Sequence, residues 1–461
     1  MVTIFGEESK FLKEKNFGLL ERLFVWSITF EPLLFFIVAS QSVTGVGGNI
    51  SRLLQLIVIV CLFVRTLMTP FHLVRVFNPF NSYFLWYSVY FIFLITSFIF
   101  GYFSGAYESY QSDVNSSSLI NNSLVRPAFE HFIALYYFIY FGVLPIFLLR
   151  SKKGINYFFK AFFFMFFLSF LLGTIDLMLV LLTGYEFIPR HLSDFTHVGN
   201  RFHGIAGEPR DAFVYLFFGG SLLFLREIWT GIKFNRIWLL LIFIAALLTQ
   251  STSGYLGLLM ASALIFVYLL PRMSILSAIS LTMVILIGAV VVLTAILSST
   301  RIQLYLDAAP IAFDALESGV ELPMLIMYQI NNIYPIWLRW LDVLALNLTP
   351  LFIGTGLGTA SIANGYILTE GGVLNPHANI IRIFFESGFI GILLYIAAFF
   401  QPIKKLSILI PKPTQILIPM LLMLGVSFGH RSATLFIFFG IALVVFHFKK
   451  YAPESDGIDI K

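Results

Sequence analysis

Two short polar stretches in this very apolar chain carry residue types that bind anions and move protons. The first, residues 201–211, places Arg201 and Arg210 around Glu208 and ends in a Pro–Arg–Asp sequence typical of the first turn of a helix. Guanidinium groups fit phosphate oxygens, and a helix amino terminus adds partial positive charge. We therefore predict an anion site here. The alternative is a structural turn in which Glu208 pairs with one of the two arginines.

The second stretch, residues 375–391, contains His377, Arg382 and Glu386. Arg382 and Glu386 are four residues apart, so they share one face of the predicted helix as an ion pair. An imidazole at a helix boundary can accept a proton near neutral pH, which makes His377 a candidate general base. A lone histidine at such a boundary is more commonly a hydrogen-bonding group, and that alternative stays open.

Glycines near the second stretch suggest two further interpretations. Gly354, Gly356 and Gly358 resemble a dinucleotide-binding loop, but no strand and helix of a soluble nucleotide-binding unit surround them. We predict a flexible loop instead, and close helix packing at Gly388 and Gly391. The chain contains no His-Glu-x-x-His, paired-cysteine or carboxylate-rich pattern, so no metal and no cofactor is expected.

The apolar composition of the chain indicates that these polar residues are positioned by membrane helices. Apolar residues make up 59% of the 461 residues and charged residues 11%, far from the roughly 25% charge of soluble domains. A water-soluble fold is excluded. At about 20 apolar residues per span, the sequence predicts an all-α polytopic membrane protein with about 12 transmembrane helices, over residues 19–40, 53–69, 83–103, 127–149, 157–183, 211–226, 236–250, 254–271, 274–297, 379–401, 415–429 and 432–448.

The positions of the lysines and arginines predict the orientation, because cytoplasmic connections are enriched in them. Lysines fall in alternate connections, so both termini are predicted to be cytoplasmic. The expected organisation is nine helices within 1–297 with outward loops 104–126 and 185–210, a large extracytoplasmic segment 298–378, three helices within 379–448, and a cytoplasmic tail 449–461.

The two predicted sides differ in the kind of cation they carry. Every lysine falls on the cytoplasmic side, whereas the outward side holds only arginines: Arg52, Arg126, Arg190, Arg201, Arg210, Arg301, Arg339, Arg382 and Arg431. Guanidinium groups match phosphate oxygens and tolerate partial desolvation. We therefore predict a phosphate-bearing substrate on the outward side. The alternative is that these arginines pair with aspartates and glutamates, or extend to the membrane interface.

Two acidic residues, Glu31 and Asp176, fall within predicted spans. Charged side chains are costly in hydrocarbon and usually face a cavity or a partner. Arg65 is a candidate partner for one of them.

The order of these elements resembles the O-antigen ligase and polymerase family of bacterial integral-membrane glycosyltransferases, over roughly residues 160–450. His377, Gly388 and Gly391 reproduce the family's spacing from a histidine to a Gly-x-x-Gly element, with Ala378 where asparagine is usual. The stretch from Arg201 through Gly204 to Glu208 and Pro209 is similar to a second family element, and residues 249–254 resemble its serine-rich hairpin. Thr252 stands where ligases often have arginine, which favours the polymerase branch.

The resemblance implies a GT-C-like enzyme of the bacterial inner membrane that transfers a glycan from a polyprenyl-diphosphate donor to a sugar hydroxyl of a lipid-linked acceptor. The diphosphate would be bound by Arg201 and Arg210, with Arg301, Arg339 and Arg382 as secondary candidates. His377 would activate the acceptor hydroxyl, and Glu208 would orient an arginine or contact the sugar. A chain-length regulator is a possible partner. The alternatives are an O-antigen ligase acting on lipid A core or protein, and a transporter or flippase of lipid-linked oligosaccharide.

Overall fold

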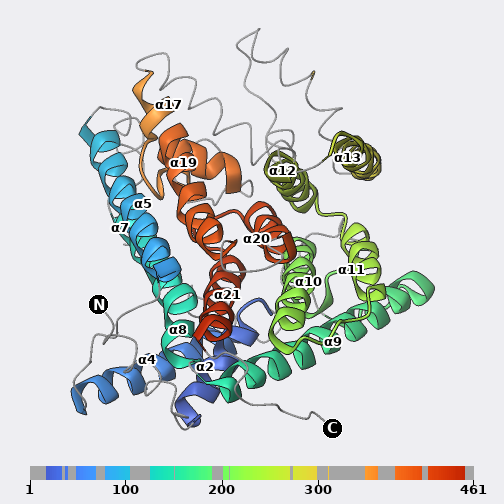
Figure 1. Ribbon diagram of the computed structural model, residues 1–461, viewed down its shortest axis with the longest axis horizontal. Coiled ribbons are helices and arrows are strands. Elements are labelled where there is room, and N and C mark those ends of the chain that lie inside the picture. The colour runs from blue at the N-terminus through green and yellow to red at the C-terminus, as the bar shows by residue number, and fades with distance from the viewer. Residues whose placement is uncertain are drawn as a thin grey trace.

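The computed structural model describes residues 17–33, 37–39, 48–68, 78–103, 125–149, 151–188, 201–206, 208–269, 274–297, 310, 348–361, 379–407 and 414–451. This part of the chain is helical almost throughout (Figure 1). Its helices are α2 (Leu19–Phe30), α4 (Ile50–Met68), α5 (Asn78–Phe103), α7 (Val125–Tyr137), α8 (Leu144–Leu148), α9 (Lys152–Thr183), α10 (Pro209–Thr230), α11 (Ile237–Leu248), α12 (Thr252–Leu269), α13 (Ile275–Leu297), α17 (Thr349–Ile353), α19 (Asn379–Ser407), α20 (Thr414–Val426) and α21 (Ala433–Tyr451).

Three shorter features complete the described chain. A π-helical turn, η2 (Phe138–Val143), continues α7 into α8, and a 3-10 turn, η3 (Gly204–Ala206), precedes α10. Strands β1 (Ile37–Ala39) and β2 (Gly48–Asn49) pair in antiparallel fashion.

The chain is a helical membrane protein. Helices satisfy their own backbone hydrogen bonds, as hydrocarbon requires. Each of the twelve stretches predicted from the sequence contains a helix, although the first stretch is helical only as far as Phe30. Among the described residues, five helices are long and apolar enough to cross a bilayer: Phe80–Phe103, Val125–Leu148, Lys152–Thr183, Pro209–Thr230 and Arg382–Leu406.

The end of the first predicted helix is wrong. Helix α2 stops at Phe30 instead of continuing to residue 40, and residues 37–39 form a strand. Pro32, which lacks a backbone N–H, cannot continue the helix. The carboxylate of Glu31 is held from α4 by the hydroxyl of Ser51 and the guanidinium of Arg52, each at 2.6 Å.

The expectation that the acidic residues in the spans have partners is confirmed for Glu31. The partner of Glu31 is Arg52, whereas Arg65 lies 3.6 Å from Glu21.

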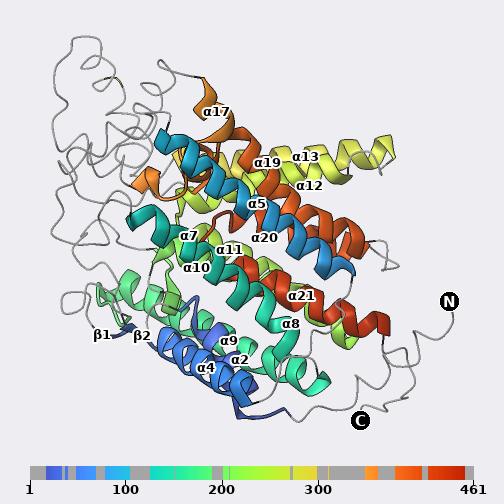
Figure 2. The ribbon, with the colours of Figure 1, turned by 90° about the vertical axis from the view of Figure 1, so that its left-hand side faces the viewer.

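Helices α5 and α19 run side by side in both views, with α17 against the start of α19 (Figures 1 and 2). An aromatic core joins them to η2 and α21. In this core Tyr87 stacks on Phe138 with ring centroids 3.9 Å apart, and Phe399 packs edge-on against Phe439. Because these rings are buried and interlocked, the ends of α5, α7, α19 and α21 are held in fixed positions relative to one another.

The end of α5, the start of α7 and the start of α19 lie at the same end of the helix bundle (Figure 2). The sequence assigns this end to the outward side of the membrane. The predicted extracytoplasmic segment 298–378 lies outside the described residues, apart from residue 310 and residues 348–361.

Candidate functional site

Helix α19 is broken in its first half. Gly388 has φ 61° and ψ −169°, which no helix accommodates. The carbonyl oxygens of Phe385 and Glu386 accept hydrogen bonds from the backbone N–H groups of Thr355 (3.1 Å) and Gly356 (2.8 Å). The hydroxyl of Ser97 on α5 also donates to the Glu386 carbonyl, at 2.9 Å. Unpaired backbone groups are costly at membrane depth, so these contacts stabilise the break.

Residues 354–361, which we call the glycine segment, supply those N–H groups. Gly354, Gly356 and Gly358 all have positive φ, at 83°, 105° and 90°. A Cβ on Gly358 would lie 2.9 Å from Glu130 Cγ, and one on Gly356 would lie 2.5 Å from the Cα of Phe98. The prediction of a flexible outward loop is wrong, because the glycines allow this backbone to be buried against α5, α7 and α19.

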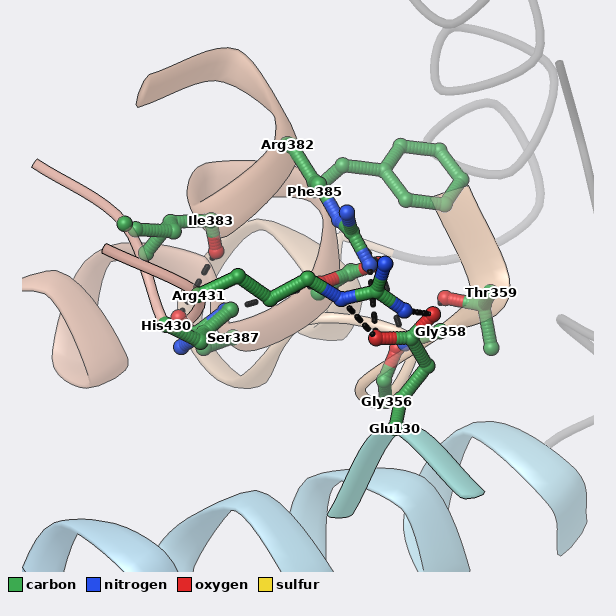
Figure 3. A network of polar contacts seen from close by, with 12 residues as sticks. Glu130, Gly356, Gly358, Thr359, Arg382, Ile383, Phe385, Ser387, His430 and Arg431 are labelled. Atoms are coloured by element: carbon green, nitrogen blue, oxygen red, sulfur yellow. Dashed lines mark hydrogen bonds and ion pairs between the residues drawn. The ribbon is translucent and has the colours of Figure 1, made fainter. Parts of the chain in front are cut away.

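Beside the glycine segment, arginines from three parts of the chain surround the carboxylate of Glu130 on α7. Arg431, in the connection from α20 to α21, donates through Nε to Glu130 Oε2 (2.8 Å) and through its terminal nitrogen to Oε1. Arg126, one helical turn before Glu130, lies 2.8 Å from Oε1, and Arg382 on α19 lies 3.2 Å from Oε2. Figure 3 shows Arg382 and Arg431 reaching Glu130 from two different segments of the chain. We call Arg126, Glu130, Arg382 and Arg431 the arginine cluster.

A second carboxylate, that of Glu386, lies deeper beside the cluster. Its Oε1 accepts hydrogen bonds from Arg382 Nε (3.1 Å) and from the backbone N–H of Gly358 (2.9 Å). The predicted ion pair between Arg382 and Glu386 is therefore confirmed. The Gly358 contact also connects the ion pair to the glycine segment, so the fold of that segment and the position of Arg382 depend on one another.

His430, the residue before Arg431, contacts Glu386 from the buried side of this network. Its Nδ1 lies 3.0 Å from the hydroxyl of Tyr90, and its Nε2 lies 3.5 Å from Glu386 Oε2. Burial lowers the pKa of the His430 imidazole below its usual value, more than the Glu386 carboxylate raises it. The ring is therefore neutral at pH 7, with one nitrogen as donor and the other as acceptor.

The arginine cluster has the chemistry of an anion site. Guanidinium groups bind carboxylate and phosphate oxygens in the same forked geometry. The members of the cluster differ in exposure: the side chain of Arg431 is 31% exposed, whereas that of Glu130 is 2% exposed. An anion from outside the protein would therefore meet Arg431 first.

The stretch from Arg201 to Asp211 forms a separate group around the start of α10. As predicted, the helix begins at Pro209 with Asp211 in its first turn. Arg201, however, donates to the carbonyl oxygens of Thr249 (2.9 Å) and Gln250 (2.6 Å) at the end of α11. These contacts cap a helix carboxyl terminus. Arg201 thus joins the segment before α10 to the connection between α11 and α12.

The residue before α10, Glu208, has an extended backbone, and its carbonyl oxygen accepts a hydrogen bond from the N–H of Ala212. Arg210 follows in the first turn and is half-buried. Both lie at a helix amino terminus, as the sequence predicts.

Asp176 on α9 holds both ends of the predicted outward loop 185–210. Its Oδ1 accepts hydrogen bonds from the N–H groups of Phe187 (2.7 Å) and Ile188 (2.8 Å). Its Oδ2 lies 3.2 Å from Nε2 of His203, which is buried beside a small pocket before α10. The expectation that Asp176 has a partner is confirmed, with His203 as that partner.

The predicted site residues thus fall into two groups. Arg382 belongs to the arginine cluster, whereas Arg201, Glu208 and Arg210 surround the start of α10. His377, Arg301 and Arg339 lie outside the described residues.

Glu130 and His430 belong to no motif that the sequence predicts to form a site, and Arg126 and Arg431 were predicted only to lie on the outward side. One signal was available, because a charged residue within or between apolar stretches usually has a partner. The alternative that outward arginines pair with acidic residues is confirmed for Arg52, Arg126, Arg382 and Arg431.

Within the described part of the chain, no group of three or more His, Cys, Asp or Glu side chains is arranged to hold a metal ion. Comparison with protein-family models, with curated proteins and with solved structures finds no match to this chain. Its function must therefore be inferred from its residues and their geometry.

Proposed function

We propose that this protein is a polysaccharide polymerase that transfers a glycan from a polyprenyl-diphosphate donor to a lipid-linked acceptor at the outer leaflet of a bacterial inner membrane. The observation that carries the proposal is the arginine cluster. Guanidinium groups of Arg126, Arg382 and Arg431 meet at one carboxylate, at the end of the bundle that the sequence assigns to the outward side. A phosphate-bearing lipid headgroup is a substrate that such a cluster would bind.

The proposed reaction needs positive charge more than it needs a strong base. The acceptor hydroxyl attacks the anomeric carbon, the bond from that carbon to the diphosphate oxygen breaks, and the diphosphate leaves with its negative charge. Guanidinium groups already in position stabilise that charge as it develops. His377 would take the hydroxyl proton, and Glu208 and Arg210 at the start of α10 would position the sugar or the diphosphate.

Several finer expectations belong to the same proposal. The chain would have about 12 spans in a GT-C-like arrangement, both termini in the cytoplasm, and a chain-length regulator as partner. Cys61 is the only cysteine. A Cys61→Ser background therefore permits single cysteines to be placed in each connection and tested with membrane-impermeant thiol reagents. Labelling of residues near 190 from the cytoplasmic side would contradict the orientation.

The reaction can be tested with the full chain reconstituted in nanodiscs. A polyprenyl-diphosphate-linked repeat unit should be converted to longer glycans with release of polyprenyl diphosphate. The variants Arg431→Ala, Arg210→Ala and His377→Ala should abolish product. Arg236→Ala is the matched control, because Arg236 pairs with Glu227 at 2.9 Å outside the proposed site. Lengthening only when lipid A core is supplied would identify a ligase instead.

One observation favours transport of lipid-linked oligosaccharide as a second candidate function. Secondary transporters place their binding sites at broken helices inside the membrane, and α19 is broken at Gly388 next to buried charges. Proteoliposomes containing a fluorescent lipid-linked sugar distinguish the two functions. Movement of the label across the bilayer without any new glycosidic bond would support the transporter and contradict the polymerase.

A further inference from the structure

We propose that Arg382 and Arg431 form an anion site that the carboxylate of Glu130 occupies as an internal substitute for the substrate's diphosphate. Arg126 would keep Glu130 paired when the diphosphate replaces it. The inference rests on the proposed function for the identity of the anion. The site itself is argued from the contacts of four side chains.

The contacts around Glu130 are those of a bound anion. Arg431 presents two nitrogens in a fork, Nε to Oε2 (2.8 Å) and its terminal nitrogen to Oε1, and Arg382 approaches Oε2 at 3.2 Å. Forked contacts of this kind serve carboxylates and phosphoryl groups alike. A diphosphate carries more negative charge than one carboxylate and so would compete with Glu130 for both arginines.

The exchange leaves no buried carboxylate without a cation. Glu130 has a third arginine, Arg126, one turn away on the same helix at 2.8 Å. Arg382 keeps its contact with Glu386 through Nε at 3.1 Å. Leaving one member of a buried ion pair alone is strongly unfavourable, so these remaining contacts make the exchange possible.

Arg431 is the side chain best placed to begin the exchange. It is the most exposed of the three arginines, at 31% compared with 9% for Arg126 and 8% for Arg382. Within the described residues, Glu130 is the carboxylate that Arg431 contacts. Among the described residues, an anion arriving from the exposed side would therefore compete with a single carboxylate for Arg431.

Glu386 differs from Glu130 in a way that separates the two roles. Its Oε1 also accepts the backbone N–H of Gly358, and its side chain is fully buried. Displacing Glu386 would release the glycine segment. In the cluster, Glu130 contacts arginine side chains and no backbone group. Its carboxylate can therefore be replaced by a diphosphate without releasing a backbone segment.

The test measures diphosphate binding to the detergent-purified full chain by isothermal titration calorimetry. The two ligands are inorganic pyrophosphate and farnesyl diphosphate. Glu130→Gln keeps the shape of the side chain and removes the competing charge, so both ligands should bind at least about tenfold more tightly. Arg431→Ala should lose binding. Glu31→Gln, which alters the buried pair with Arg52 in α2 and α4, is the matched control and should bind as the wild type does.

Two results with Glu130→Gln would overturn the inference. One is a folded Glu130→Gln variant, monodisperse on size exclusion, that binds pyrophosphate no more tightly than the wild type. The other is equal tightening in Glu130→Gln and Glu386→Gln, which would indicate a general effect of removing negative charge. If Glu130→Gln does not fold, Glu130→Asp takes its place: it keeps the charge but shortens the reach to Arg431, so binding should still tighten. An unchanged affinity in a folded Glu130→Asp would also overturn the inference.

Comparing pyrophosphate with farnesyl diphosphate distinguishes a free diphosphate from a lipid-linked one. Measuring polymerisation distinguishes the failure of this inference from the failure of the proposed function. Tightening for both ligands indicates that the diphosphate group itself is recognised, and tightening for neither contradicts the exchange. Tightening in Glu130→Gln without any polymerisation by the wild type would contradict the proposed function and leave the anion site intact. Polymerisation by the wild type with unchanged affinity in Glu130→Gln would overturn only the exchange.

Discussion

Arginine is used differently in two regions at the predicted outward end of this bundle. Around the start of α10, Arg201 donates to the backbone carbonyl oxygens of Thr249 and Gln250. In the arginine cluster, Arg382 and Arg431 donate to the side-chain carboxylate of Glu130. The carboxylate is an anion, so the cluster already holds negative charge between guanidinium groups as it would hold a phosphoryl group, whereas backbone carbonyls are neutral acceptors. The cluster is therefore the better candidate for a site that binds and releases a charged substrate.

The largest expected effect comes from removing a cation from the cluster. Arg382→Ala takes a partner from both Glu130 and Glu386, which are 2% and 0% exposed, and should destabilise the fold by about 3–5 kcal/mol. Arg201→Ala loses one hydrogen bond to buried Thr249 and one to exposed Gln250, and should cost about 1 kcal/mol. Thermal unfolding in detergent measures both. If Arg382→Ala and Arg201→Ala reduce the stability equally, the two regions do not differ in how they use arginine.

Gly358 is the next most sensitive position, because alanine there would require both an unfavourable φ and space that Glu130 and Pro127 occupy. Gly358→Ala should cost about 2–4 kcal/mol. Gly184→Ala is the matched control: Gly184 has φ 73° at the end of α9, and nothing lies within 4 Å of an added Cβ. It should cost only about 1 kcal/mol. A Gly358→Ala variant as stable as Gly184→Ala would mean that the glycine segment does not support the cluster.

A smaller effect is expected at the clamp between Asp176 and His203. Asp176→Asn keeps an oxygen for the N–H groups of Phe187 and Ile188 but loses the charge facing His203, at an expected cost of about 1–2 kcal/mol. A double-mutant cycle with His203→Gln should show coupling between the two side chains. Strictly additive losses would indicate that the pair does not hold the loop ends together, and would leave Arg201 as the main contact of the α10 region.

The smallest effect concerns pH and His430. Its pKa in the folded protein is lowered by burial, so below pH 6.5 the unfolded chain binds a proton that the folded chain does not. The free energy of unfolding is therefore unaffected by protonation of His430 above about pH 6.5 and decreases as pH falls toward the folded pKa. The loss should be under about 1 kcal/mol at pH 6. The difference in thermal stability between wild type and His430→Gln, followed from pH 7.5 to 5.5, isolates this contribution. A difference that does not change with pH would contradict it.

Much of the helical architecture could be predicted from the sequence. Apolar runs separated by glycine, proline and charged residues mark helices, and all twelve predicted stretches contain one. The start of α10 at Pro209 and the pairing of Arg382 with Glu386 also follow from local rules about helix ends and four-residue spacing. The prediction failed at the end of α2 because it followed a continuous apolar run past Pro32, which ends the helix, and because the contact of Glu31 with α4 is tertiary.

Apart from the pair of Arg126 and Glu130, which are one turn apart on α7, the arginine cluster was decided by tertiary structure. Glu130 and Arg431 are 301 residues apart in the sequence, and Tyr90 and His430 are 340 apart. The sequence by itself determined that charged residues in such a chain need partners, because hydrocarbon penalises an isolated charge. Which carboxylate each arginine meets depends on how α5, α7, α19 and α21 pack and on glycines that let residues 354–361 lie between them. That packing depends on contacts between residues far apart in the sequence, so local spacing could not predict it.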